Sequence, residues 1–201
     1  MNRLTSAPAQ PPAGRRAGMK GIHPMTDTGQ PSTTHAKAST DYQKTIRVKA
    51  SPGVLFDALT SLAGLAAWWT CATGSGDTGG ELRFLFDSPE QPCVMHVDQA
   101  TRPTSVQWTC IEYSVLPDWA GTHPAFTITP VDDGTSELRF RHYGLTPELD
   151  CIEVCTRGWD HFLTSLRDYA ETGRGTPFGS SADKARRVQG TRRLPDDPEG
   201  T

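Results

Sequence analysis

The sequence lacks any long hydrophobic run. No apolar stretch approaches the roughly 18 residues that a membrane-spanning helix requires. The basic residues near the N-terminus are not followed by the apolar segment of a secretory signal. We therefore expect no transmembrane segment and a cytoplasmic protein.

Cysteine is scarce and lacks the spacing of a metal site. The chain has five cysteines, an odd number, and no Cys/His set is arranged in tight pairs. Cys151 and Cys155 lie within one expected helix, where an intact backbone disfavours a disulfide between them. This pattern suits a reducing compartment, and it predicts no metal site.

The signatures of several enzyme classes are also missing. The glycine-rich stretch at residues 74–80 has no GK[ST] ending and no helix behind it, so it does not predict a phosphate-binding loop. No nucleophile elbow occurs, and the carboxylates of Asp98 and Glu112 lie near the ends of expected strands. A net charge of −3 argues against a nucleic-acid partner. We assign no catalytic residue and expect no cofactor; whether the protein is an enzyme stays open.

What remains is typical of one ordered domain between two polar tails. Residues 1–40 and 179–201 are polar and show no hydrophobic periodicity, which predicts disorder. The ordered domain is expected at residues 41–178. A single domain is the default for a chain of 201 residues.

A long amphipathic helix is expected near the end of this domain. The stretch from Asp150 to Thr172 predicts a helix about 30 Å long, and Gly173 predicts its end. Apolar residues recur on one stripe at Cys155, Trp159, Phe162, Leu163, Leu166, Tyr169 and Ala170. Because these large side chains must be buried, the rest of the chain has to supply a broad apolar surface.

The preceding residues predict two short helices and about six strands. Pro52 starts the first short helix, and the second runs from about Leu62 to Trp69. The expected strands are residues 42–50, 81–86, 93–98, 105–112, 125–129 and 137–143. Short links predict an antiparallel sheet. We therefore predict an α+β fold in which a curved antiparallel sheet wraps around the long C-terminal helix, with two short helices after the first strand.

Several short motifs follow one another in a characteristic order. They are WAGT at residues 119–122, DGT at 133–135, HYGL at 142–145, GW at 158–159 and GRGTP at 173–177. The series, together with the segment from Val48 to Trp69, resembles the activator of heat-shock-protein-90 ATPase homologue-like family. The resemblance spans about residues 41–178. It implies the START-like (SRPBCC) superfamily, the helix-grip fold, and a deep cavity between helix and sheet for an apolar small molecule.

Residues on the inward faces are the candidates for lining such a cavity. They are Trp68, Trp69, Phe84, Phe86, Met95, Trp108, Phe126, Phe140, His142, Trp159 and Phe162. Apolar pockets with a few polar groups are built in this way. The alternative is that the same side chains simply fill the core.

Two histidines lie on expected strands among apolar neighbours. His96 and His142 have imidazoles suited to orienting a ligand carbonyl or transferring a proton. The alternative for both is a hydrogen-bonded structural role. His123 and His161 occur in polar surroundings and are expected to be exposed.

These observations predict a module that binds a hydrophobic small molecule or lipid-like ligand in the cavity. One alternative is a polyketide cyclase or aromatase-like enzyme, in which His142, or a tyrosine or tryptophan that lines the same cavity, polarises a ketone. Another is a chaperone-associated interaction module with a protein partner. The co-chaperone members of the family carry an additional N-terminal domain, and the outward positions Arg83, Glu137, Arg139 and Arg141 are charged rather than apolar.

Overall fold

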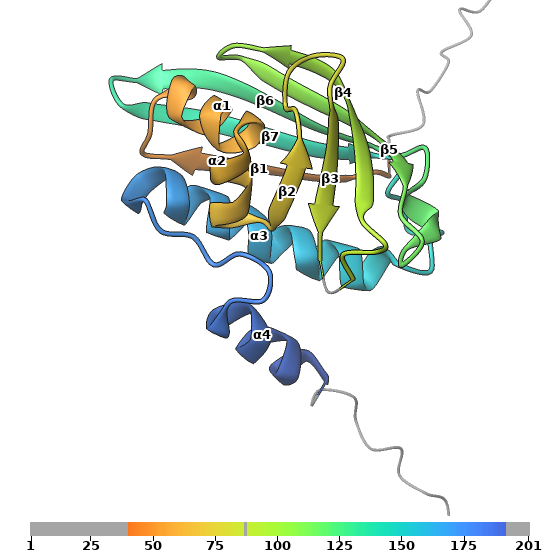
Figure 1. Cartoon of the computed structure of the whole chain (residues 1–201). Coiled ribbons are helices and arrows are strands. Elements are labelled where there is room, and N and C mark those ends of the chain that lie inside the picture. Colours follow the sequence, from red (N-terminus) through yellow and green to blue (C-terminus); the bar gives the residue numbers. More distant parts are fainter. Residues whose placement is uncertain (1–39, 87, 192–201) are drawn as a thin grey trace, which may run out of the picture. The chain divides into compact units, whose positions relative to one another are not determined.

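The computed structural model describes residues 40–86 and 88–191 (Figure 1). The strands are β1 (Tyr42–Val48), β2 (Cys71–Gly74), β3 (Glu81–Leu85), β4 (Cys93–Thr101), β5 (Ser105–Glu112), β6 (His123–Asp132) and β7 (Thr135–Tyr143). The helices are α1 (Pro52–Thr60), α2 (Leu62–Trp68), α3 (Ile152–Thr172) and α4 (Ser181–Thr191), and Pro117–Trp119 form the short 3-10 helix η1. Residues 1–39 and 192–201 of the predicted tails lie outside the described residues.

All seven strands form one antiparallel sheet. Its order is β1-β7-β6-β5-β4-β3-β2. Figure 1 shows the sheet curving over α3, with α1 and α2 at one end. This arrangement confirms the predicted α+β fold. The seventh strand, β2, has no periodicity of its own, and its pairing with β3, which places Gly74 opposite Leu82, makes it a strand.

Helix α3 carries the stripe that its sequence predicts. Trp159, Phe162 and Leu166 are buried, and the interior face of the sheet covers them. The helix ends at Gly173, which has a φ of 76°, a left-handed conformation that glycine adopts without strain. Its N–H group donates to the carbonyl of Tyr169 at 2.8 Å. The C-terminal end of α3 therefore follows from the backbone conformation that Gly173 adopts.

The structure differs from the expected disordered tail from residue 179. Residues 181–191 form helix α4, which has a polar sequence. Its Asp183 is fully buried, and the N–H of Asp183 donates to the hydroxyl of Ser180 at 3.2 Å. Because polar contacts rather than an apolar stripe hold this helix, hydrophobic periodicity does not reveal it.

Gly158 is a position in α3 where a substitution can stabilise the protein. A Cβ added there would meet nothing within 4 Å. Gly158→Ala should raise the free energy of unfolding by about 0.5–1 kcal/mol, because alanine loses less backbone entropy in a helix. Urea unfolding followed by circular dichroism measures this change. A loss of stability would show that the space beside Gly158 is needed by a neighbouring side chain.

Candidate functional site

Aromatic side chains from α2, α3, η1 and four strands meet between α3 and the sheet. We call the following nine residues the aromatic interior: Trp68, Trp69, Phe84, Phe86, Trp108, Trp119, Phe126, Phe140 and Trp159. Trp69 lies at its middle, with its ring centroid 4.3 Å from that of Phe84, 5.2 Å from Trp159 and 5.7 Å from Trp108. Such distances are those of rings in direct contact.

The structure brings the eleven predicted site residues into one core. Ten of them are buried, including Met95, Phe162 and His142, and Phe86 is half-buried. Contact of these residues with a ligand stays a prediction.

Two hollows outlined by the described residues lie on the outside. One, of about 470 Å³, is lined by Arg47, Val48, Lys49, Thr135, Arg167, Asp168 and Glu171. The other, of about 300 Å³, is lined by Gln107, His123 and Tyr143. None of the eleven predicted residues lines either hollow. Trp69, Trp108 and Phe140 are at most 1% exposed and contact neighbouring rings, so the aromatic interior is closed and a ligand that enters it has to displace some of these rings.

Trp108 carries a polar atom without a partner inside this interior. Its indole Nε1 is buried and has no hydrogen-bond partner among the described residues. By contrast, Trp68 donates to the carbonyl of Ala58 at 2.9 Å, and Trp159 donates to His142 at 2.9 Å. A buried N–H group without an acceptor costs about 1–3 kcal/mol. An acceptor brought by a bound molecule would remove this cost.

His142 lies at the centre of a complete hydrogen-bond chain. Trp159 Nε1 donates to His142 Nδ1, so the neutral imidazole carries its proton on Nε2. This Nε2 donates to Thr122 Oγ1 at 2.7 Å, and the Thr122 hydroxyl donates to the carbonyl of Trp119 at 2.7 Å. Burial lowers the pKa of His142 from its ordinary 6.5 to about 3. In this conformation neither ring nitrogen of His142 is free to polarise a ligand carbonyl, so the cyclase alternative would have to use a tyrosine or tryptophan of the interior.

The other histidines occupy different places. His96 is exposed, with Nδ1 3.0 Å from a carboxylate oxygen of Asp98, and Thr109 bridges Asp98 to His123 on the same outer face. The prediction that His123 is exposed is wrong, because it is half-buried, with Nδ1 2.8 Å from the hydroxyl of Thr109. The prediction that His161 is exposed is wrong, because its side chain is only 13% exposed. The segment after α3 covers it, a tertiary contact that its polar neighbours do not reveal.

Trp119 lies outside all the expected helices and strands, yet its side chain is buried in the core. Its ring lies parallel to that of Trp159 at 5.9 Å and edge-on to His142 at 4.9 Å. Its Nε1 donates to the sulfur of Cys155 at 3.1 Å. The proline and aspartate before it predict only a turn. The one available signal was its place in the WAGT motif.

The described residues offer neither a metal site nor a membrane-spanning helix. Among residues 40–86 and 88–191, no three His, Cys, Asp or Glu side chains gather in a way that would hold a metal ion. None of the helices described there has the length and apolarity to span a bilayer. All five cysteines are free thiols.

Comparison with known proteins decides the family. The model of the family described as Activator of Hsp90 ATPase homolog 1-like protein matches residues 49–171. The chain belongs to this family. The resemblance drawn from the motifs is thereby confirmed, and with it the START-like (SRPBCC) helix-grip fold. No curated protein matches the sequence.

Solved structures of similar proteins agree with this assignment. The Aha1 dimer from Colwellia psychrerythraea is 29% identical, with a TM-score of 0.59, and the match covers 67% of this chain and 98% of that one. An Hsp90 activator from Plasmodium falciparum is 18% identical, with a TM-score of 0.53 and coverages of 64% and 94%. CalU16 from Micromonospora echinospora is 15% identical, with a TM-score of 0.55 and coverages of 75% and 81%. The last two show a shared fold alone.

Proposed function

We propose that this member of the Activator of Hsp90 ATPase homolog 1-like family binds a hydrophobic or lipid-like small molecule between α3 and the sheet. The unpartnered indole N–H of Trp108 carries this proposal. The Trp108 ring is stacked on Trp69 with an interplanar angle of 5°, and it contacts Phe84 and Phe126. An aromatic surface with one directed donor fits an apolar molecule that carries a hydrogen-bond acceptor.

The closed interior is then the ligand-free form. Binding has to separate rings that now contact one another, such as Trp69 and Trp108, whose centroids are 5.7 Å apart. Two gains offset this cost: the ligand restores apolar contacts to the displaced rings, and its acceptor pairs the Trp108 N–H. A ligand without an acceptor gains only the first and should bind less tightly.

Titration of the full chain with 11-(dansylamino)undecanoic acid tests this function, because energy transfer from the buried tryptophans reports binding. We expect a dissociation constant in the micromolar range. Trp108→Phe should weaken binding about tenfold, since one hydrogen bond contributes about 1.4 kcal/mol. Tyr143→Phe, a ring change on the outer face, is the control and should leave the affinity unchanged.

Two results together would overturn the proposal. The first is that no energy transfer occurs up to the solubility limit of the probe. The second is that native mass spectrometry of the protein purified from cell extract gives only the mass of the bare chain.

A second candidate function rests on the 29% identity to the Aha1 dimer, which extends over 98% of that protein. We propose, as the alternative, a protein-interaction module that acts on an Hsp90-type chaperone. The outer face of the sheet suits a polar interface, since Arg139 is 67% exposed there and lies 3.5 Å from Glu137. The ATPase rate of Hsp90 should rise at least twofold in the presence of excess protein. An unchanged rate, with no complex in analytical ultracentrifugation, argues against this alternative.

A further inference from the structure

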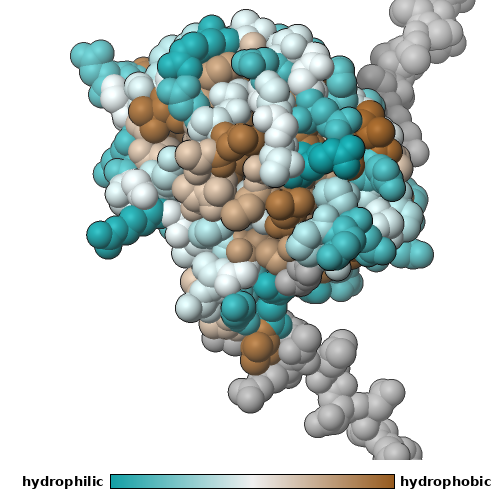
Figure 2. All heavy atoms as spheres, viewed as in Figure 1, coloured by the Kyte–Doolittle hydropathy of each residue, from teal (hydrophilic) through white to brown (hydrophobic). Residues whose placement is uncertain are grey.

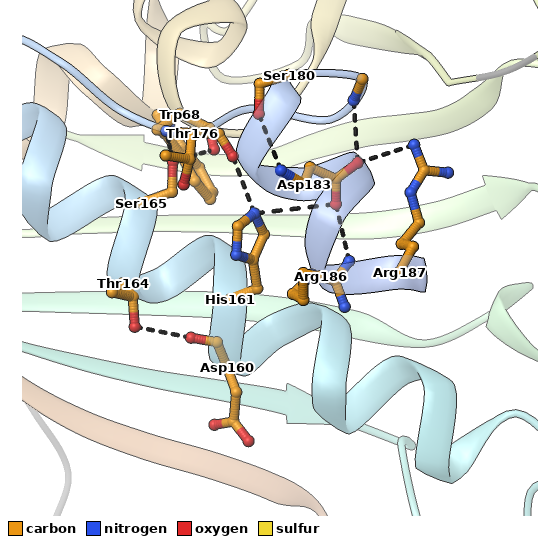
Figure 3. Close-up of polar contacts among 11 residues, drawn as sticks. Trp68, Asp160, His161, Thr164, Ser165, Thr176, Ser180, Asp183, Arg186 and Arg187 are labelled. Atoms are coloured by element: carbon orange, nitrogen blue, oxygen red, sulfur yellow. Dashed lines mark hydrogen bonds and ion pairs between the residues drawn. The ribbon is translucent and has the colours of Figure 1, made fainter. Parts of the chain in front are cut away.

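The segment that follows α3 folds back onto the molecule. We call residues 174–180 the strap. The N–H of Phe178 donates to the carbonyl of Trp69 at 2.7 Å. Nε2 of His161, on α3, donates to the carbonyl of Thr176 at 2.9 Å, as Figure 3 shows. The strap is therefore hydrogen-bonded to His161 of α3 on one side and to Trp69 of the aromatic interior on the other.

The strap packs tightly against the end of α2. The hydroxyl of Ser165 donates to the carbonyl of Trp68 at 2.8 Å and accepts the N–H of Thr176 at 2.7 Å. A Cβ added to Gly175 would collide with the carbonyl oxygen of Ala67 and lie 3.0 Å from the Cα of Trp68. Glycine is needed here because the two backbones are in contact.

Phe178 covers the place where the aromatic interior reaches the surface. Its ring meets the ring of Phe86 edge-on, with centroids 5.0 Å apart. Phe86 is half-buried and contacts both Trp69 and Tyr113, at 5.9 and 5.7 Å. Apolar side chains gather on this face around α2 and β3 (Figure 2). Removal of Phe178 would uncover a path from solvent through Phe86 to the interior.

Helix α4 holds the strap in place through one buried carboxylate. Asp183 is fully buried and accepts the N–H of Gly179 at 3.0 Å. It forms ion pairs with Arg186 and Arg187, both at 2.8 Å (Figure 3). Arg187 also lies over the ring of Phe178, 4.2 Å from its centroid. Burial acts to raise the pKa of Asp183, but these donors and charges outweigh it and lower the pKa, so the carboxylate is ionised.

We propose that the strap and α4 form the gate of the aromatic interior. Release of α4 frees Phe178 from Phe86 and gives an apolar ligand a route past Phe86 to Trp69 and Trp108. The inference rests on the proposed ligand-binding function and names where the ligand passes. The strap is the part to open first, because its contacts to the core are a few hydrogen bonds and one ring, whereas α3 buries a whole stripe.

The tryptophans provide a test that needs no ligand. All five are at most 6% exposed, so acrylamide should quench their fluorescence weakly in the wild-type protein. Asp183→Asn removes the buried carboxylate that pairs with Arg186 and Arg187, and should raise the quenching constant at least twofold. Lys184→Ala changes an exposed residue on the same helix and should have no effect. Equal quenching in all three proteins would overturn the gate.

Hydrogen exchange separates local opening from unfolding. In Asp183→Asn the N–H of Phe178 should exchange at least tenfold faster, while the amides of β7 keep their wild-type rates. If the β7 amides accelerate by the same factor, the opening is global and the proposal is overturned. Phe178→Ala, which removes the ring and leaves Asp183 bonded to the N–H of Gly179, should reproduce the increased quenching.

Stopped-flow mixing with 11-(dansylamino)undecanoic acid links the gate to binding. The association rate should be at least fivefold faster for Asp183→Asn than for the wild type and for Lys184→Ala. If quenching rises but the probe binds neither form, the gate stands and the ligand-binding function fails. If all three proteins bind the probe at one rate, the gate fails and the function stands.

Discussion

Trp159→Phe should lower the free energy of unfolding by about 3 kcal/mol, whereas Trp108→Phe should cost about 1 kcal/mol or less. The chemical change is the same, both rings belong to the aromatic interior, and both side chains are at most 2% exposed. The difference lies in the indole N–H. Trp159 donates to His142, so its loss leaves the imidazole Nδ1 buried and unpaired, whereas Trp108 loses a donor that has no partner.

Urea unfolding followed by far-UV circular dichroism measures both changes, since tryptophan fluorescence is itself altered. A double-mutant cycle supplies the control. In a His142→Leu background the acceptor is gone, so Trp159→Phe should cost no more than Trp108→Phe. Equal costs for the two substitutions in the wild-type background would contradict the assignment, because they would mean that an acceptor also pairs the Trp108 N–H.

The parts of the fold that local chemistry decides could be predicted from the sequence. The stripe that contains Trp159 and Phe162 predicts α3, Gly173 predicts its end, and Pro52 predicts the start of α1. The alternation around Phe140 places this residue on the inner face of β7. In each of these cases the spacing of hydrophobic residues, or the backbone preference of a few neighbouring residues, is sufficient to predict the local structure.

What could not be predicted depends on partners that are distant in the sequence. Trp119 is buried because α3 brings Trp159 and Cys155 against it. Helix α4 is held by the ion pairs of the buried Asp183, and these produce no periodic pattern of hydrophobic residues in the sequence. Nothing in the sequence around Trp108 says that its N–H lacks an acceptor. Since this atom carries the proposed function, the sequence could indicate an aromatic site but not its polar anchor.

Acidification from pH 7 to pH 4 should remove about 3 kcal/mol of stability through His142 alone. Its pKa is about 3 in the folded protein, mainly because of burial, and its ordinary value is 6.5. Between these values the unfolded chain binds a proton that the folded protein does not bind. The free energy of unfolding therefore falls as the pH falls, by up to about 1.4 kcal/mol per pH unit. The pKa of His161 is also lowered, mainly by burial, and acts in the same direction.

His142→Gln isolates this effect, because a glutamine amide can accept from Trp159 and donate to Thr122 without titrating. Carboxylates titrate in both proteins, so the measured quantity is the difference between the two curves of unfolding free energy against pH. That difference should change by about 3 kcal/mol between pH 7 and pH 4. His96→Gln removes an exposed imidazole and is the matched control. Parallel curves for the wild type and His142→Gln would mean that the buried imidazole accepts a proton without unfolding, and that the chain from Trp159 to Thr122 can open inside the core.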